Sequence, residues 1–599
     1  MITRGFDCPV ARWLAFLMLF FTSLFLAAIS DSSAPNNDKS FDGPAELPRE
    51  YVKSSLKDTP AGGKTWAVRS AETLQQILGS ASCGDVIQLQ AGATFNGSFV
   101  IPAKKCDNFH WIVIRTSAPD SSLPPEGTRL TPCFAGVSPL TGRPHLNCAS
   151  TNNVLAKIEF NGSGGSGPLT FASGANHYRL IGLEVTRSAS SADVNNLVQF
   201  LGPADHVVFD RVWMHGTAQD ATARGIMLGT TRYVAVVDSF FSDFHCISRT
   251  SSCTDAQAIA GGIGESDGST GPYKIVNNFL ESAGENIMFG GGRSTTTPAD
   301  IEIRHNHMFK PLTWMKGQPG YVGGGNGNSF IIKNLFELKN AQRVLLEGNI
   351  LENSWGGFSQ VGFAIVLTPK NPGGCASCQV TDVTIRYNVI SHVGAGMQIA
   401  NALADKETAI DGQRYSIHDI VIDDIDGTKY DGPGEFAQVS VQPGAPLLQN
   451  VVINHVTAFP SRTLFIIGDM VATSAPMKNF VFTNSIVNAG VSPVWSTGGG
   501  PANCAFHDIP VTTFSSCFSD SSFTANAIIA SPAGYPAGSW PAQNFFPVSA
   551  AAVKFADYNG GNGGDYRLQP SSPYKGKGTD GKDLGADVDA IHSATAGVE

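Results

Sequence analysis

Apolar and polar positions repeat along this chain in one phrase: two apolar residues two positions apart, a turn residue three positions later, and one more apolar residue. Four copies carry asparagine in the turn position, at Asn278, Asn306, Asn349 and Asn388. Looser copies carry other residues there: Leu183, Val212, Ser239, Ile425, Val456 and Ser485. A strand, a bend and the start of another strand cannot bury an apolar face alone, so such units must stack. The pattern predicts a solenoid of strands.

The spacing of the copies indicates a regular coil with inserted loops. The turn positions Leu183, Val212 and Ser239 are 29 and 27 residues apart, whereas Asn306 and Asn349 are 43 residues apart. Further apolar strings lie between the phrases, at residues 196–200, 225–228, 286–289, 335–338, 363–367, 396–399 and 464–467. We therefore expect three strands in each coil.

The repeated asparagines have two interpretations. Stacked inside the bend, they bond to one another's side-chain amides, which satisfies polar groups that burial would otherwise leave costly. Alternatively, they are independent surface turns with asparagine in the left-handed conformation. Their equal offsets from flanking apolar residues favour the internal ladder.

Four regions follow from the pattern. We expect a signal peptide at 1–30, a flexible leader at 31–70, the strand solenoid at 71–490, and a loop-rich C-terminal region with a closing rung or cap at 491–599. The solenoid begins with a stretch that suggests a short helix followed by a strand. A helix there would cover the open end of the solenoid and hide unpaired strand edges.

Composition and charge limit the partners. The 599 residues include 65 Gly and 34 Pro, and only 15% are charged, which favours frequent turns and few long helices. The net charge of −10 argues against a nucleic-acid partner, which would favour a basic stripe. It does not argue against an acidic polysaccharide, because a local site can oppose the overall sign.

The N-terminus predicts export. Arg4 and Arg12 precede an apolar run over residues 13–29, and small residues follow, as in a secretory signal peptide. An uncleaved membrane anchor is the alternative. No later segment has about 18 uninterrupted apolar residues. We expect a secreted, periplasmic or extracellular protein, and a monomer.

The cysteines agree with export. Apart from Cys8 they form neighbouring pairs, namely Cys83/Cys106, Cys133/Cys148, Cys246/Cys253, Cys375/Cys378 and Cys504/Cys517. An even number and short spacing predict disulfides that staple loops. The Cys375-x-x-Cys378 pair also fits a redox or zinc motif, but no second such pair completes a metal site.

Three parts of the sequence resemble the pectate lyase superfamily: residues 72–92 (ETLQQILGSASCGDVIQLQAG), the asparagine phrases, and residues 568–586 (LQPSSPYKGKGTDGKDLGA). The resemblance covers most of residues 71–590. It implies an all-β fold, a right-handed single-stranded parallel β-helix with an N-terminal capping helix. It is less specific for activity, because this architecture carries lyases, hydrolases, esterases, epimerases and adhesins.

The stretch from Asp255 to Lys316 resembles the core of pectate lyases in its order of strands and acidic residues. By that comparison Asp255, Glu281 and Glu285 match acidic positions that hold calcium and the substrate carboxylate. Calcium takes carboxylate, carbonyl and water oxygens, so a few carboxylates on adjacent rungs suffice. Solvated surface acids are the alternative.

A lyase acting on uronic acids also needs a base. The Arg-x-Pro-x-x-Arg motif of the resembling pectate lyases is absent, and Lys310 and Lys316 stand in that region instead. We expect either lysine to serve as the catalytic base. Residues expected to bind substrate are Gln257, Asn286, Arg293, His305, Glu337, Lys339 and Lys370. For Glu337 and Lys339, a solvated salt-bridge cluster is the alternative.

Two functions remain open. One is a secreted polysaccharide lyase, or a related epimerase, acting on an acidic glycan. The other is a carbohydrate-binding or surface-structural β-helix without turnover, which the missing arginine motif and the N-terminal segment favour.

Overall fold

The computed structural model describes residues 40–599 apart from 139, 191, 249–252, 358–359, 372–373, 403–411, 443, 470–475 and 507–508. Residues 41–599 form one unit. The signal segment predicted at 1–30 lies outside the described residues. No helix in the described part of the chain is long and apolar enough to cross a membrane.

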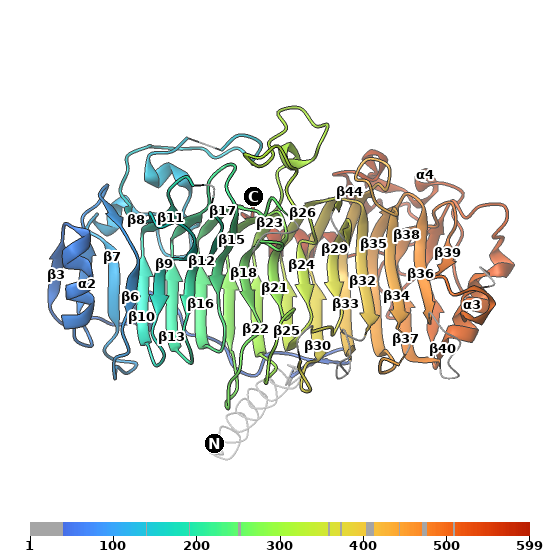
Figure 1. Cartoon of the computed structure of the whole chain (residues 1–599). Coiled ribbons are helices and arrows are strands. Elements are labelled where there is room, and N and C mark those ends of the chain that lie inside the picture. The colour runs from blue at the N-terminus through green and yellow to red at the C-terminus, as the bar shows by residue number, and fades with distance from the viewer. Residues whose placement is uncertain are drawn as a thin grey trace, which may run out of the picture. The chain divides into compact units, whose positions relative to one another are not determined.

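Almost every strand pairs in parallel with the strand one coil away, and the chain winds into a right-handed parallel β-helix with three strands in each coil (Figure 1). Sheet 1 holds the strands that precede the turn position: β3 (Thr65–Val68), β4 (Val86–Leu89), β7 (Ile112–Thr116), β10 (Asn176–Ile181), β13 (Asp205–Asp210), β16 (Arg232–Val237), β19 (Tyr273–Val276), β22 (Ala299–Arg304), β25 (Ala341–Glu347), β30 (Val380–Arg386), the first parts of β33 (Gly412–Ile425) and β35 (Gln449–Pro460), β37 (Met477–Thr483), β40 (Phe518–Ser519) and β41 (Ser522–Thr524).

Sheet 2 holds the strands that follow the turn position. It is joined to sheet 1 by the two long strands β33 and β35, which belong to both sheets. Its other strands are β5 (Thr94–Asn96), β8 (Ala156–Phe160), β11 (Leu183–Arg187), β14 (Trp213–His215), β17 (Phe240–Phe244), β20 (Phe279–Ser282), β23 (His307–Phe309), β26 (Ile350–Ser354), β31 (Val389–Val393), β38 (Ile486–Asn488) and β42 (Ala527–Ile529).

Sheet 3 is a separate row of parallel strands that closes each coil. It holds β6 (Phe99–Ile101), β9 (Gly165–Phe171), β12 (Val194–Phe200), β15 (Thr222–Met227), β18 (Gln257–Gly261), β21 (Glu285–Phe289), β24 (Phe336–Leu338), β29 (Phe363–Leu367), β32 (Ala395–Asn401), β34 (Glu435–Val441), β36 (Thr463–Asp469) and β39 (Val494–Ser496). The predicted fold class is therefore confirmed.

The repeated asparagines form the internal ladder. Asn278 Nδ2 donates to Asn306 Oδ1 at 2.9 Å, Asn306 Nδ2 to Asn349 Oδ1 at 3.0 Å, and Asn349 Nδ2 to Asn388 Oδ1 at 3.0 Å. All four side chains are fully buried. Ser239 continues the column, because its backbone N–H donates to Asn278 Oδ1 at 2.9 Å. The residue before each asparagine adopts the left-handed conformation that the sharp bend needs, as at His305 with φ 58°.

Helix α2 (Ala71–Ser80) covers the N-terminal end of the coil, as predicted. Leu74 and Leu78 enter the continuous core, and the side-chain amide of Gln75 pairs with both backbone groups of Val100 on β6. These two bonds satisfy the exposed edge of the first strand of sheet 3.

Residues 41–64, which fall within the segment predicted as a leader, run along the outer side of sheet 1. The backbone N–H groups of Glu46 and Arg49 donate to Asp382 and Asp300, which lie on different coils. The buried Arg179 donates to the carbonyl of Ser54 at 2.8 Å. We call residues 41–64 the strap. Its first residues pair as a short hairpin, β1 (Phe41–Asp42) with β2 (Ala45–Glu46).

The C-terminal region contributes the last rung, β40 to β42, and then folds back along the outside of sheet 2. Its remaining elements are α3 (Pro510–Cys517), α4 (Ala550–Val553), the pair β43 (Phe555–Asp557) and β44 (Asp565–Leu568), and α5 (Val588–Thr595). Ile591 of α5 is buried with Val421 and Phe459 of sheet 2. Arg129 donates to the carbonyl of Val598 at 2.6 Å.

Five disulfides join the cysteines in the predicted pairs: Cys83–Cys106, Cys133–Cys148, Cys246–Cys253, Cys375–Cys378 and Cys504–Cys517. The Cys375-x-x-Cys378 motif is therefore a disulfide in this structure. Each bridge closes a short loop, so the five together pin excursions from the coil rather than join distant rungs.

Candidate functional site

The candidate site lies at the edge of sheet 3 where strands β18, β21 and β24 begin. Gln257 and Glu285 are register partners at the starts of β18 and β21. The chain between β23 and β24 leaves the coil as a long loop, residues 310–335, and re-enters at Lys333, whose backbone N–H donates to Ala283 O. On β24, Phe336 and Leu338 enter the core, so Glu337 between them points outward.

Three carboxyl groups and two lysines meet at this edge, and we call them the acid–lysine cluster: Asp255, Glu285, Lys333, Glu337 and Lys339. Lys333 Nζ lies 3.1 Å from Asp255 Oδ2 and 3.7 Å from Glu285 Oε1. Lys339 Nζ lies 2.9 Å from Glu337 Oε1. Glu285 and Glu337 are buried, whereas the Asp255, Lys333 and Lys339 side chains keep 23%, 11% and 18% of their exposure. The last three are therefore the groups that a ligand can reach.

Amides hold the buried acids in place. Gln257 Nε2 donates to Glu285 Oε2 at 2.8 Å, and Gln257 Oε1 accepts from Arg224 Nε at 2.7 Å. Asn334 Nδ2 donates to Glu337 Oε2 at 2.6 Å. Gln257, itself buried, thus orients Glu285 and cannot contact a ligand in this arrangement.

The pKa values of Asp255 and Glu337 are raised, whereas that of Glu285 is lowered. Burial and the neighbouring Glu285 carboxylate raise the pKa of Asp255 to about 8, against the pull of Lys333. Burial also raises the pKa of Glu337, to about 7. Burial opposes ionisation of Glu285 too, but Lys333 and a hydrogen bond from Asp255 bring its pKa to about 2. Asp255 and Glu337 can therefore gain or lose a proton near neutral pH.

Both lysines of the cluster stay charged. Burial lowers the pKa of Lys333, but Glu285 and Asp255 outweigh burial and raise it above its usual range. Glu337 acts in the same way on Lys339 and raises its pKa. Neither lysine can accept a proton near neutral pH, so both serve as fixed positive charges for an anionic group.

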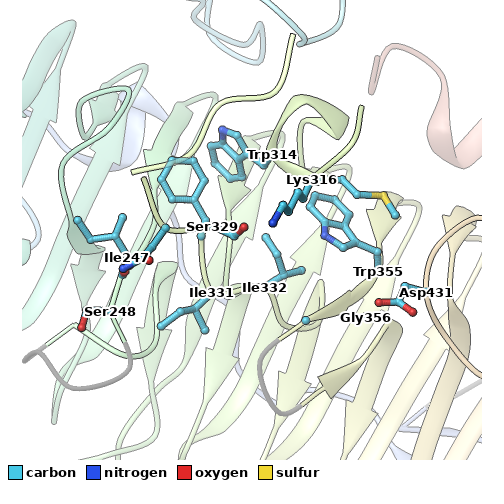
Figure 2. A pocket seen from close by; sticks show the side chains of 14 residues that line it. Ile247, Ser248, Trp314, Lys316, Ser329, Ile331, Ile332, Trp355, Gly356 and Asp431 are labelled. Atoms are coloured by element: carbon cyan, nitrogen blue, oxygen red, sulfur yellow. The ribbon is translucent and has the colours of Figure 1, made fainter. Parts of the chain in front are cut away.

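A cavity of about 500 Å³ opens near the point where the loop at 310–335 returns to the coil, and Figure 2 shows residues that line it. Its walls come from the loop at 310–335 and from the chain after β26, and they include Trp314, Lys316, Ile331 and Trp355. Figure 2 shows Lys316 between the two tryptophans. Ile331 packs against Cys253 and Ala256, which flank Asp255, and Ile332 directly precedes Lys333, so the cavity adjoins the cluster.

Lys310, expected as a base, is enclosed. Its side chain is fully buried, and Nζ donates to Ser282 O at 2.9 Å, Gly284 O at 2.5 Å, Asn334 O at 2.9 Å and Asn286 Oδ1 at 3.0 Å. Burial lowers its pKa to about 7, but every proton of the ammonium points to a protein acceptor. Lys310 therefore ties the loop to sheets 2 and 3 and does not reach a ligand.

Glu281, expected as a metal ligand, belongs to a different cluster. Its fully buried carboxylate pairs bidentately with Arg143, at 2.7 Å to both oxygens, and Arg143 also lies 2.6 Å from Asp243 Oδ1. The guanidinium lies 5.5 Å from the Trp314 ring. Arg143 thus anchors the stapled excursion over sheet 2 and supports one wall of the cavity.

The other expected substrate-binding residues are dispersed. Asn286 is fully buried, and its Nδ2 donates to Leu280 O and Phe309 O inside the coil. Arg293 forms an exposed ion pair with Glu265. His305 is half-buried in the bend before Asn306 and lines a second cavity with Arg129. Lys370 is half-buried beyond the end of β29.

The oxygens predicted to hold calcium fit that ion only in part. Asp255 Oδ1 and Glu285 Oε1 are buried and receive no hydrogen bond, as metal ligands would. A proton shared between the two carboxyls satisfies the same atoms, however, and Lys333 Nζ already stands beside both groups. Calcium would have to displace that ammonium, so we assign it no step.

Sequence reasoning missed several parts of the site. Lys333 belongs to a charged stretch with Glu337 and Lys339, but nothing in the sequence predicted its contact with Asp255. Arg143 reaches the site from an excursion 138 residues before Glu281. Trp314 and Trp355 could have been found from the sequence by one signal. Both are aromatic residues near insertions, and insertions predict loops that cover the coil.

Comparison with family models and with curated protein sequences found no match. Solved structures do match in fold. An alginate lyase from Paenibacillus sp. str. FPU-7 is 12% identical, with 73% of this chain and 96% of that chain covered and a TM-score of 0.28. Pectate lyase Pel9A is 10% identical (88% and 97% covered, TM-score 0.33). The PL6 family polysaccharide lyase Pedsa3628 from Pseudopedobacter saltans is 12% identical (79% and 95% covered, TM-score 0.38). These are likenesses of fold.

Proposed function

We propose that this protein is an exported polysaccharide lyase that acts on an acidic, uronic acid-containing glycan at the acid–lysine cluster. One observation carries the proposal: Asp255, partly exposed and with a raised pKa, lies 3.1 Å from a fixed ammonium and next to a cavity. The five disulfides support export.

The chemistry of β-elimination matches these groups. The reaction removes the proton next to the uronate carboxylate and breaks the bond to the glycosidic oxygen. Lys333 and Lys339 neutralise the carboxylate and the charge that develops on it. Asp255, as its carboxylate, takes the proton and returns it to the departing oxygen, which requires a pKa near the working pH.

The cavity supplies a place for the sugar. Trp314 and Trp355 offer aromatic walls, and Lys316, exposed between them, adds a third positive charge for a uronate. Lys316, which the sequence suggested as a catalytic base, is a substrate-binding residue in this proposal. Lys310 and Glu281 take structural roles.

The test is an assay of purified protein on pectate, alginate and glycosaminoglycans, followed by the ultraviolet absorbance of the unsaturated product. We expect Asp255→Asn to lower turnover at least about 100-fold, the low end of the effect of a general base. Lys339→Met should raise KM and also lower kcat, because Lys339 neutralises both the bound carboxylate and the charge that develops on it. The control is Arg293→Gln, which removes an exposed ion pair with Glu265 that involves no residue of the cluster.

Two results would contradict the proposal. One is an absence of unsaturated product on the whole panel. The other is product formed equally well by Asp255→Asn. Binding without turnover, measured by calorimetry on the same glycans, would instead select the non-catalytic carbohydrate-binding β-helix.

A further inference from the structure

A second cavity, of about 520 Å³, opens over sheet 2 and shares no lining residue with the first. Its floor includes Phe240 of β17 and Phe279 of β20, whose rings stack with centroids 4.3 Å apart. Its walls come from residues 127–131 and 143–147, from the bends between sheets 1 and 2, and from residues 596–599. Cavities of this size with an apolar floor and a few polar groups bind small organic ligands.

One cation of the wall has no anion beside it. The half-buried Arg129 donates to three carbonyls, Asn277 O at 3.2 Å, Val598 O at 2.6 Å and His305 O at 3.3 Å, and to Asn277 Oδ1 at 3.3 Å. A guanidinium has five N–H groups, so one on Nη1 remains. No carboxylate of the described residues forms an ion pair with Arg129, and burial lowers its pKa to about 10 against the attraction of Asp238. An anionic ligand would compensate this charge.

Two imidazoles of the wall are available to a ligand. The rings of His145, which is exposed, and of His305, which is half-buried, form no hydrogen bond with any described residue. Burial and the positive charges of Arg129 and Arg304 lower the pKa of His305, so its ring is neutral near neutral pH. A neutral imidazole offers one donor and one acceptor, the pair of contacts that a hydroxyl group makes. Among the described lining residues Glu599 is the only acid, and it is exposed.

We propose that the second cavity binds a small carboxylated sugar, a uronate of one or two rings. Arg129 takes the carboxylate, His305 and His145 take hydroxyl groups, and the phenylalanine floor takes the apolar face of the ring. An inorganic anion would use the arginine but not the floor, and a neutral sugar lacks the charge that Arg129 needs. This site goes beyond the proposed lyase activity and does not depend on it.

The test is isothermal titration calorimetry of the variant Lys316→Met/Lys339→Met with sodium glucuronate and sodium galacturonate. This background removes two lysines that the proposed function assigns to substrate, so the remaining binding reports the second cavity. We expect one site, with affinity at least about tenfold lower in Arg129→Gln, which removes a hydrogen bond to a charged group. His305→Asn should also weaken binding, and asparagine tolerates the φ of 58° there. Glucose and sodium phosphate should bind at least about tenfold more weakly than the uronates.

A matched control is His110→Gln, which changes an exposed histidine that does not line the cavity and should leave the affinity unchanged. The C–H signals of the His305 ring, assigned in NMR spectra by their loss in His305→Asn, should shift with glucuronate and not with glucose. If Arg129→Gln loses its melting transition, His305→Asn and these signals decide. An unchanged affinity in His305→Asn with unshifted ring signals, binding of glucose or phosphate as tight as that of glucuronate, or no binding at all would overturn the proposal.

Discussion

The titration of Asp255 ties the proposed chemistry to stability. Its pKa of about 8 in the folded protein lies above the ordinary value of 3.8, so the folded state binds this proton more tightly. The stability that this proton binding contributes is fully present below about pH 4 and is lost as the pH rises through 8. Asp255→Asn mimics the protonated form. At pH 9 this variant should therefore melt at a higher temperature than the parent protein, and its free energy of unfolding should be larger by at least about 1 kcal/mol.

Melting curves of both proteins at pH 5 and pH 9 check this. The difference between them should shrink or reverse at pH 5, where Asp255 is already protonated. Catalysis should show the opposite trend, because kcat/KM needs the carboxylate and should rise with pH through an inflection near 8. A flat pH profile would remove Asp255 as the base.

Two lysines close in sequence should respond differently to the same substitution. Lys310→Met leaves Asn286 Oδ1 and three buried carbonyls without their donor, and each unsatisfied group costs about 1–3 kcal/mol. Lys316→Met removes only an exposed charge and should change the melting temperature little while raising KM for an acidic glycan. Denaturation and kinetics of the two variants make the comparison, and equal stability of both would contradict the role given to Lys310.

At the level of elements, the asparagine column sets the bends between sheets 1 and 2. Asn306→Ala removes the donor to Ile275 O and to Asn349, and the acceptor of Asn278, all inside the coil. We expect the free energy of unfolding to fall by about 2–5 kcal/mol. Asn306→Ser should lose less, since serine fills the same position naturally at Ser239 and accepts from the Val212 N–H. Urea unfolding of the two variants tests this order, and an Ala variant as stable as the Ser variant would contradict it.

The elements were also the part most readable from the sequence. Strand stacking depends on the short-range alternation of apolar and polar residues and on equal spacing between the turn residue and its apolar neighbours. Both are visible in phrases such as that around Asn306. The position of Lys333 depends on how a long loop returns to the coil, and the pairing of Arg143 with Glu281 depends on contacts between distant segments. A hydrophobic pattern carries no information on either, so the fold was predictable and the assembly of the cluster was not.

For the whole molecule, the charge balance of the cluster predicts independence from added calcium. Lys333 and Lys339 already stand beside the carboxyl groups that the sequence suggested as calcium ligands. Treatment with EDTA should therefore leave lyase activity on a suitable glycan within about twofold, an effect well under 1 kcal/mol. The measurement is the initial rate before and after chelation, with calcium added back. A loss that calcium restores would show that an ion replaces the ammonium of Lys333.

The strap gives the molecule a mechanical property that a plain stack of repeats lacks. Repeat arrays usually open from one end, because each unit touches only its neighbours. Here one stretch of backbone is fastened at Arg179, at Asp300 and at Asp382, so the terminal turns cannot peel away without also pulling on turns in the middle. A single proteolytic cut near residue 50 should thus turn one cooperative melting event into fraying from the ends, while the chain fragments remain associated.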